Sequence, residues 1–309
     1  MMNEFDLIDH AFRQKLSFIH SLTSIPLGDD ASVHAVPVDH ELVVSTDMSI
    51  AGVHWPHDFP LQDAACRAVN AALSDLAAMG AEACWVWCCA ALKDGAAAEL
   101  MGEGIAAALS GSGIELAGGD TVHAAENSLS VTVAGIVPKG QAMRRGTARI
   151  GDDIWLCGRL GFSALGLRRW QQGERTEAAV NAFRDVKPLL SEGVDLRKAG
   201  VSCCIDVSDG LLADAGHLAD ASCVGMEIEV SRIPSYIELA DQLDSETATS
   251  LVLAGGEDYA LVCTAPPGLR DVLSAIAARI GHCVEGSRVR ALLDGVETHP
   301  PQRGFDHFA

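Results

Sequence analysis

The stretch Leu73-Ser74-Asp75-Leu76-Ala77-Ala78-Met79-Gly80-Ala81 sets the character of the fold. It ends a run of small and apolar residues that predicts a helix over 61–79, with Gly80 as the residue that stops the helix. The apolar run Ala83–Leu92 follows directly and is typical of a fully buried strand. A helix followed at once by a buried strand indicates a mixed α/β protein.

Strands and helices follow one another irregularly along the rest of the chain. The pattern predicts strands over 41–45, 114–117 and 202–207, and helices over 4–20, 211–222 and 268–280. Strict strand–helix–strand alternation is missing, which favours a two-domain α/β (α+β) architecture of mixed sheets packed with helices over a barrel. Residues 138–152 hold proline, glycine and three arginines, so we expect domains over 1–145 and 146–309.

Composition excludes several classes of protein. The 309 residues carry 42 acidic and 22 basic side chains, a formal net charge of −20, which argues against a generic nucleic-acid binder. The ten cysteines contain no C-x-x-C pair and predict neither a zinc ribbon nor a disulfide framework. Acids near the start, in Met1–His10, argue against a signal peptide. No apolar run is long enough to span a bilayer. We therefore expect a cytoplasmic protein.

Carboxylates recur where predicted strands stop. The acids concerned are Asp29, Asp30, Asp47, Asp120, Asp206, Asp209, Glu257 and Asp258. Taken singly, each Gly-Asp or Asp-Gly pair is ordinary turn chemistry. Gathered carboxylates repel one another and need cations, and oxygen ligands without cysteine or histidine pairs suit Mg²⁺. The glycines beside them let the backbone approach phosphate oxygens. The pattern as a whole predicts Mg²⁺-assisted phosphate chemistry.

Asp75 differs from the other acids because it lies inside a predicted helix, among small and apolar residues. A buried acid is costly unless it is paired or bound to a metal ion, so a metal-ligand role is favoured over a surface position. The motifs of P-loop ATPases, Rossmann dehydrogenases, protein kinases and serine hydrolases are all missing from the chain.

Several motifs together carry a family resemblance. In chain order they are Leu27-Gly28-Asp29-Asp30-Ala31, Ser45-Thr46-Asp47 with Gly52-Val53-His54-Trp55, the Leu73–Ala81 stretch, Gly118-Gly119-Asp120-Thr121, Ile205-Asp206-Val207-Ser208-Asp209-Gly210-Leu211, Gly255-Gly256-Glu257-Asp258-Tyr259 and Gly304-Phe305-Asp306-His307-Phe308. This set closely resembles the thiamine-monophosphate kinases of the aminoimidazole-ribonucleotide-synthetase-like superfamily, over nearly the whole chain. The Leu73–Ala81 helix and the C-terminal tail are the most specific elements.

The resemblance implies an N-terminal ATP- and Mg-binding domain that forms a homodimer through its sheet, and a C-terminal α/β domain that completes the active-site cleft. It implies the final step of thiamine diphosphate synthesis, transfer of phosphate from ATP to thiamine monophosphate. By similarity, Asp30, Asp47, Asp75 and Asp209 would be catalytic. Several Mg²⁺ ions would be held by Asp30, Ser45, Thr46, Asp47, Asp75, Asp120, Asp206 and Asp209. ATP would contact Gly119, Asp120, Arg145 and Ser208. Thiamine monophosphate would contact His54, Glu257 and Phe305.

Simpler interpretations exist for four of these residues. Without the resemblance, Arg145 is a solvated charge in a basic linker, and Ser208 caps the helix that follows it. His54 is equally a loop histidine that bonds to the backbone. Phe305 is either a core plug or an aromatic that stacks on the substrate.

The chemistry needs no general base, because the acceptor phosphate is mostly dianionic at neutral pH. The difficulty is to bring two polyanions together. Metal ions and one arginine would neutralise their charge, and the phosphate would pass in a direct in-line transfer. Two alternatives stay open: another ATP-dependent synthetase of the superfamily, and a non-catalytic sensor of thiamine phosphates. The chain departs from the family pattern at Ala72, Ala106 and Val122, which bear on adenine binding and leave every proposed metal ligand in place.

Overall fold

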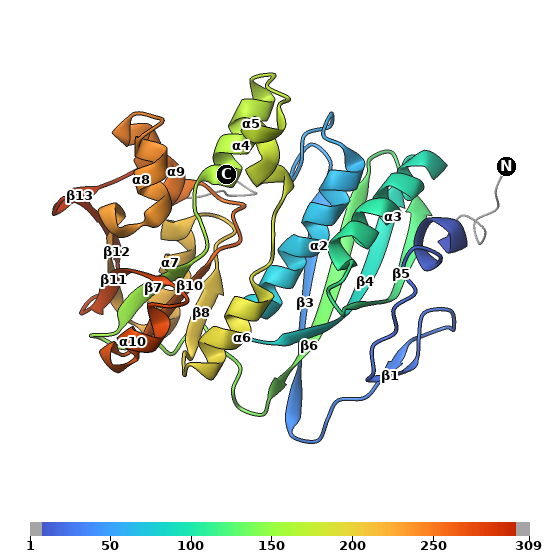
Figure 1. The fold of residues 1–309 in the computed structure, drawn as a ribbon, viewed down its shortest axis with the longest axis horizontal. Coiled ribbons are helices and arrows are strands. Elements are labelled where there is room, and N and C mark those ends of the chain that lie inside the picture. Colours follow the sequence, from blue (N-terminus) through green and yellow to red (C-terminus); the bar gives the residue numbers. More distant parts are fainter. Residues whose placement is uncertain (1–7, 301–309) are drawn as a thin grey trace. The chain divides into compact units, whose positions relative to one another are not determined.

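The computed structural model describes residues 8–300, and the chain divides into two compact units. The first comprises Met1–Leu76 and Ala81–Gly140, and the second comprises Ala77–Gly80 and Gln141–Ala309. Each unit is built around its own main sheet (Figure 1). Between residues 8 and 300, no helix combines the length and the apolar character that crossing a bilayer requires.

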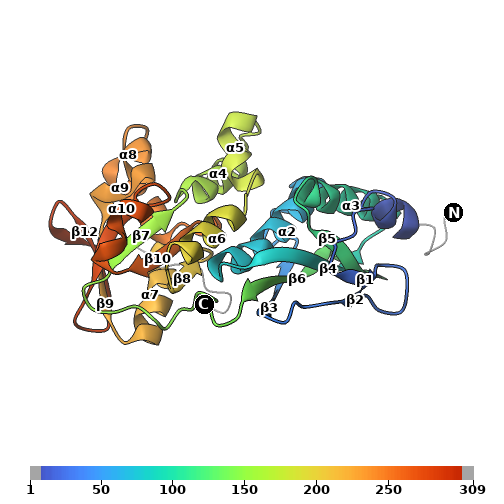
Figure 2. The same ribbon diagram turned by 60° about the horizontal axis from the view of Figure 1, so that its bottom comes forward.

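A four-stranded sheet forms the centre of the first unit. Its strands are β3 (His40–Ile50), β4 (Glu82–Leu92), β5 (Glu115–His123) and β6 (Ser128–Pro138), in the order β3-β6-β4-β5. Only the β4–β5 pair is parallel; β6 runs antiparallel to both of its neighbours. Helices α2 (Leu61–Ala78) and α3 (Gly95–Leu109) cover one face of this sheet (Figure 2). The Asp94 side chain caps α3 by accepting a hydrogen bond from the Ala97 amide at 2.8 Å.

A small hairpin lies on the other face of the sheet (Figure 2). It consists of β1 (Thr23–Ile25) and β2 (Val33–His34), and it follows a single π-helical turn, η1 (Asp9–Arg13). Two indole N–H groups of β4 fasten it. Trp85 donates to the Thr23 hydroxyl at 2.9 Å, and Trp87 donates to the Ser32 hydroxyl at 3.2 Å.

The second unit contains a seven-stranded mixed sheet in the order β13-β12-β9-β11-β7-β10-β8. Its strands are β7 (Asp153–Cys157), β8 (Cys203–Asp206), β9 (Gly225–Glu229), β10 (Leu261–Ala265), β11 (Ala278–Val284), β12 (Val289–Leu293) and β13 (Val296–Thr298). Its helices are α4 (Phe162–Gln171), α5 (Glu177–Arg184), α6 (Leu190–Lys198), α7 (Leu211–Ser222), α8 (Pro234–Ala240), α9 (Ser245–Ala254) and α10 (Arg270–Leu273), with 3-10 turns η2 (Val230–Arg232) and η3 (Pro267–Leu269).

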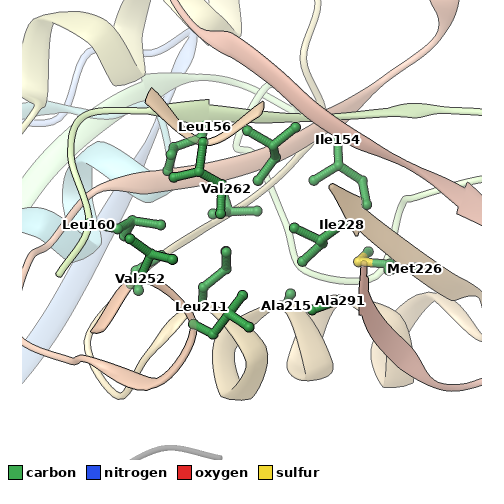
Figure 3. Close-up of a cluster of buried hydrophobic side chains, with 14 of the residues drawn as sticks. Ile154, Leu156, Leu160, Leu211, Ala215, Met226, Ile228, Val252, Val262 and Ala291 are labelled. Atoms are coloured by element: carbon green, nitrogen blue, oxygen red, sulfur yellow. The ribbon is translucent and has the colours of Figure 1, made fainter. Parts of the chain in front are cut away.

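Alternating side chains of the central strands build a core on both faces of this sheet. On β7, Ile154 and Leu156 pack with α7 and α9, and Figure 3 shows Leu211 of α7 and Val252 of α9 in this cluster. Trp155 and Cys157 point to the opposite core, which contains α6 and α10. Burial of each large apolar side chain contributes about 1.5–3 kcal/mol, so both faces are needed for stability.

The predicted fold class is confirmed, and three predicted elements match closely. The predicted helix over 211–222 is α7, the helix over 61–79 is α2, and the buried strand over 83–92 is β4. Gly80 ends α2 as predicted: its φ is +66°, and the Ala81 amide bonds back to the Leu76 carbonyl at 2.9 Å.

Other predicted bounds were wrong. The strand expected over 41–45 is the eleven-residue β3, because β6 pairs with it along its whole length, from His40 opposite Pro138 to Ile50 opposite Ser128. Likewise β5 does not stop at 117 but continues to His123 beside β4. In both strands the ladder hydrogen bonds outweigh the turn preference of Ser, Thr, Gly and Asp.

Two predicted helices were also too long. Residues 268–280 contain the short α10 and then the start of β11, because β11 pairs with β7 on one side and β9 on the other. The helix expected over 4–20 is, from residue 8 onward, only the turn η1. The chain after η1 is irregular, and the His20 amide donates to the Glu115 carboxylate at 2.9 Å.

A buried ion pair fastens α10 to the sheet. The Asp153 side chain, which is 2% exposed, accepts from Arg270 Nε at 2.6 Å and Nη2 at 2.8 Å, and from Arg279 Nη1 at 3.2 Å. The Arg270 bonds hold the pKa of Asp153 below its ordinary value, although burial works in the opposite direction. The carboxylate is therefore charged in the folded protein.

We expect Asp153→Asn to lower the free energy of unfolding at neutral pH by about 1–3 kcal/mol, because it leaves the arginines without a charged partner. A depressed folded-state pKa stabilises the fold above the unfolded pKa, and this stabilisation is lost as pH falls through the folded value. The difference from wild type should shrink below a pH of about 4. Urea unfolding across pH measures it, with the exposed Asp271→Asn as control. A difference that does not depend on pH would contradict this assignment.

Candidate active site

Asp75 is half-buried, whereas the other residues from Ala71 to Ala78 of α2 are buried, and it faces β3. The Ser45 hydroxyl donates to Asp75 Oδ2 at 2.5 Å. Hydrogen bonds to a charged carboxylate are short and strong, so this bond offsets part of the cost of holding an acid in an apolar helix. Two predicted metal ligands are thus brought into direct contact.

The predicted Ser45-Thr46-Asp47 set lies within β3 and not after a strand end as expected. Successive side chains of a strand point to opposite faces, so Ser45 and Asp47 share the face that meets α2. Asp47 is half-buried there. The Thr46 hydroxyl is on the opposite face, where it bonds the Thr132 hydroxyl at 2.9 Å.

The Asp30 segment is an exposed turn ahead of β2. The Asp30 amide donates to Asp29 Oδ1 at 2.9 Å, which is the local side-chain-to-backbone bond that stabilises such turns. The Asp30 carboxylate is exposed to solvent. This geometry leaves Asp30 accessible to a cation.

Gly119 and Asp120 lie inside β5, which corrects the expectation that they follow a strand end. Gly119 has a φ of +157°, and an added Cβ would lie 2.0 Å from the Cys88 carbonyl oxygen, so only glycine fits. Asp120 is exposed and accepts the Thr121 amide at 2.8 Å. Because β3 and β5 are the two edge strands, Asp47 and Asp120 lie at opposite edges of the sheet.

The second unit carries the other predicted acids in the loop between β8 and α7. Asp206 ends β8 and is 6% exposed, while Ser208 and Asp209 are half-buried. Gly210, with a φ of +125°, precedes the first residue of α7. The loop is closely packed at this glycine, because an added Cβ would lie 3.0 Å from the Ala254 backbone.

Asp214, one turn into α7, holds this loop in shape. Its Oδ2 accepts the backbone amides of Ser208 at 3.0 Å, Asp209 at 3.1 Å and Gly210 at 3.1 Å. Burial, with a smaller contribution from the nearby Asp209 carboxylate, raises the pKa of Asp214 to about 6, although hydrogen bonds from the loop amides work in the opposite direction. No role for Asp214 was predicted from the sequence. Its signal was an acid in the first turn of a predicted helix directly after Ser-Asp-Gly.

The Gly255–Tyr259 segment packs directly on that loop. The Glu257 amide donates to the Ser208 carbonyl at 2.7 Å, and the Tyr259 amide donates to the Val207 carbonyl at 2.9 Å. Glu257 and Tyr259 both have positive φ, of 70° and 54°. The Tyr259 hydroxyl donates to Glu257 Oε2 at 3.3 Å. Ser208 and Glu257, predicted to contact different substrates, are therefore neighbours. Backbone strain of this kind concentrates at functional sites.

Asp258 was quoted in the motif but given no role by the sequence analysis. Its Oδ2 accepts the Gly161 amide at 2.6 Å, and its Oδ1 accepts the Ser163 amide at 2.9 Å. These amides belong to the first turn of α4 and the residue before it. Asp258 thus fastens the Gly255–Tyr259 segment to the beginning of α4, in the manner of a helix-capping carboxylate.

Three further predicted site residues have different surroundings. Arg145 is exposed, and its backbone carbonyl accepts the Ser222 hydroxyl at 3.0 Å. His54 Nδ1 accepts the Ile50 amide at 3.1 Å, so this histidine makes the backbone bond of the simpler interpretation. Phe305 lies outside the described residues.

The site residues therefore form two sets. Asp30, Ser45, Asp47, Asp75 and Asp120 belong to the first unit, and Asp206, Ser208, Asp209 and Glu257 belong to the second. Within residues 8–300, no three His, Cys, Asp or Glu side chains converge tightly enough to hold a metal ion by themselves. The donors are all oxygens, from carboxylates and hydroxyls, which is the chemistry of a hard cation such as Mg²⁺.

Family comparisons cover both units. Residues 28–137 match the family described as AIR synthase related protein, N-terminal domain. Residues 149–294 match the family described as AIR synthase related protein, C-terminal domain.

Individual proteins match over nearly the full chain. A thiamine-monophosphate kinase of Salmonella typhimurium is 34% identical over 99% of this chain and 98% of its own. The crystal structure of a thiamine-monophosphate kinase from Stenotrophomonas maltophilia has a TM-score of 0.85 at 35% identity, over 96% of this chain and 98% of its own. The structure of AaThiL complexed with AMPPCP and TMP has a TM-score of 0.78 at 24% identity, over 99% of this chain and 97% of its own, and supports the fold.

We expect Asp214→Ala to lower the free energy of unfolding by about 2–3 kcal/mol, because three loop amides, of which that of Gly210 is buried, lose their acceptor. Hydrogen exchange should accelerate most at the amides of residues 208–210, and mass spectrometry of the peptide that contains them measures the change. The exposed Asp220→Ala, in the same helix, is the control and should change stability by less than about 0.5 kcal/mol. Unchanged exchange at the loop would show that Asp214 does not hold it.

Proposed function

The chain belongs to the thiamine-monophosphate kinase family of AIR synthase related proteins, and from that premise we propose that it transfers the γ-phosphoryl group of ATP to thiamine monophosphate, the final step of thiamine diphosphate synthesis. The observation that carries the proposal is the match to named kinases over 99% of the chain. The acidic loops support it, because their oxygen donors suit phosphate chemistry with a hard cation.

Magnesium is part of this proposal. Ser45 and Asp75, already in contact, offer a hydroxyl and a carboxylate on one side of β3, and Asp47 lies on the same face. Bound Mg²⁺ would neutralise phosphate charge and orient the transferred group. The residues proposed to hold several such ions are Asp30, Ser45, Thr46, Asp47, Asp75, Asp120, Asp206 and Asp209. For Thr46 the donor would be its backbone carbonyl, because its hydroxyl bonds Thr132 on the other face. Among these, Asp30, Asp47, Asp75 and Asp209 are proposed as catalytic.

The protein's own task in this reaction is positioning. The acceptor phosphate has a second pKa of about 6, so it is mostly dianionic at neutral pH and needs no base to remove a proton. A direct in-line transfer then requires that the two substrates be held in line and their charge repulsion reduced. The exposed Arg145 guanidinium is proposed to contribute to this at the ATP phosphates.

The substrate contacts are proposed by motif. Gly119 lies where a side chain would clash with the Cys88 carbonyl, and by its motif we assign it to ATP together with Asp120, Arg145 and Ser208. Glu257 is held beside Ser208 by the Ser208 carbonyl, and we assign it to thiamine monophosphate together with His54 and Phe305. A cytoplasmic location is also proposed, supported by ten cysteines that are all free thiols.

We further propose that the protein is a homodimer through the open face of the first unit's sheet. Leu42, Val44 and Met48 of β3 alternate onto that face and are 50%, 55% and 55% exposed. The hairpin β1–β2 covers β4, which β6 separates from β3, and these β3 side chains stay open to solvent. Apolar side chains gathered along an edge strand mark an interaction surface, and a second copy of the same face is its natural complement.

The kinase proposal predicts thiamine diphosphate and ADP in equal amounts from thiamine monophosphate and ATP, only when Mg²⁺ is present. Chromatography of the reaction mixture measures both products, and chelation of Mg²⁺ by EDTA should abolish them. Thiamine in place of its monophosphate should give no diphosphate, because the acceptor must be a phosphate. ADP without thiamine diphosphate would point instead to another ATP-dependent synthetase, and binding without ADP to a sensor.

The matched variant for this assay is Asp75→Asn, which keeps the shape of the side chain and removes its charge. Product formation should fall by at least about a hundredfold if Asp75 holds a metal ion at the reacting phosphates. Thermal unfolding would show that the variant is folded. Wild-type turnover in folded Asp75→Asn would make the Ser45–Asp75 contact structural only.

The dimer proposal predicts that Val44→Asp yields monomers, because a charge on the buried face of an interface is strongly unfavourable. Light scattering coupled to gel filtration measures the molar mass. Val38→Asp is the control, because Val38 is 96% exposed but lies in the loop before β3. A dimeric Val44→Asp protein, or a monomeric wild type, would refute this interface.

A further inference from the structure

A chain of polar side chains starts and ends on β5 and passes through the hairpin β1–β2. The Glu115 carboxylate at the beginning of β5 accepts the Thr23 hydroxyl at 2.5 Å. Thr23 Oγ1 lies 2.9 Å from His34 Nδ1, and His34 Nε2 lies 2.8 Å from Ser32 Oγ. Ser32 Oγ accepts the indole N–H of Trp87 at 3.2 Å. The Trp87 ring then lies against Gly118, back on β5.

The directions of these hydrogen bonds follow from a count of protons. The Thr23 proton goes to Glu115, so His34 must donate to Thr23 from Nδ1. Burial lowers the pKa of His34, which leaves the ring neutral at physiological pH, although the nearby Glu115 works in the opposite direction. His34 Nε2 therefore accepts the Ser32 proton, and Ser32 has a lone pair free for Trp87. Every donor in the chain has an acceptor, which makes the arrangement unique.

Trp87 is the member that links the two acidic segments of the first unit. Its N–H holds Ser32, two residues after Asp30. Its ring lies over Gly118, two residues before Asp120, where an added Cβ would be 2.6 Å from Trp87 Cδ1. The His34 ring meets the Trp87 ring edge-on, with centroids 5.4 Å apart and planes at 84°, and so restricts its rotation.

We propose that Trp87 and Ser32 are positioning residues, which hold the Asp30 turn and the Gly119-Asp120 segment at the spacing that cation and phosphate binding requires. What these segments bind rests on the proposed function; that one indole fastens both does not. The hairpin is also fastened at Thr23, by Trp85 and Glu115, while the bond within the Asp30 turn is local, between Asp29 and Asp30. Loss of the Trp87–Ser32 bond would let this turn move relative to β5.

Three variants test this inference. Trp87→Phe keeps an aromatic ring on β4 and removes the N–H together with part of the indole, while Ser32→Ala removes the acceptor. In the kinase assay each should raise the Mg²⁺ concentration for half-maximal activity by about five- to tenfold, the range of one lost hydrogen bond, with a smaller change in the KM for thiamine monophosphate. The double variant should be no worse than either single one, because both remove the same bond.

Ser24→Ala is the matched control. It removes a hydroxyl from the same hairpin, but Ser24 Oγ bonds the Val33 carbonyl at 3.2 Å and takes no part in the chain to Trp87. Its Mg²⁺ dependence should equal that of wild type. Additive effects of Trp87→Phe and Ser32→Ala, or an unchanged Mg²⁺ dependence in both, would overturn the proposal. A drop in activity that only follows the loss of folded protein would do the same.

A binding measurement separates this proposal from the kinase proposal. Calorimetric titration of Mg²⁺ into the protein with AMPPCP present reports cation binding without turnover. If wild type makes no thiamine diphosphate, the kinase proposal fails, while weaker Mg²⁺ binding by Trp87→Phe still supports the positioning role. If wild type is an active kinase and Trp87→Phe binds Mg²⁺ as wild type does, the positioning role alone fails.

Discussion

The Ser45–Asp75 hydrogen bond joins helix α2 to the edge strand β3 of the first unit's sheet. Asp75 is a half-buried acid in an otherwise buried part of that helix. The first unit places Asp47 on the same strand face as Ser45, and the second unit separately holds Asp206 and Asp209 in one loop of its own. On a chain with a formal net charge of −20, such groups repel one another unless a cation is bound. The fold must therefore hold carboxylates in positions that their own electrostatics oppose.

Hydrogen bonds between side chains and the nearby backbone hold the segments that carry these carboxylates. Asp214 collects three amides of the Ser208–Gly210 loop, and Asp258 collects two at the beginning of α4. Neither residue needs to touch a ligand. Both fix loops whose remaining side chains are then presented at set positions, which is how a rigid scaffold carries functional loops. The positive φ angles of Glu257 and Tyr259 persist because the amides of these two residues are bonded to the same loop.

Much of this could be predicted from the sequence where one local signal dominated. The small-residue run ending at Gly80 marked α2, the apolar run marked β4, and Ser-Asp-Gly marked the beginning of α7. The acids were found by type, and Asp75 and Asp206 lie where the sequence predicted them, but the positions of two others were wrong. Asp47 and Asp120 were expected after strands and lie within them, because pairing with β6 and β4 is a tertiary effect that a local turn preference does not contain. The strand β11 was missed for the same reason, since its identity depends on β7 and β9.

Asp214 and Trp87 were missed for a different reason. An acid in the first turn of a helix and a tryptophan in a buried strand both have common explanations, and only their contacts distinguish them.

The residues that hold the acidic loops differ in charge between the two units. In the first unit the anchors of the Asp30 turn are an indole, a hydroxyl and a neutral imidazole, so none of them competes with a cation for the carboxylates. A lysine or arginine anchor would form ion pairs with Asp30 or Asp120 and weaken cation binding. In the second unit the anchor is an acid, but its oxygen is occupied by three amides and points into the protein. Both solutions hold an acidic loop in shape through hydrogen bonds that involve no lysine or arginine, which suits a site that would bind anions through metal ions.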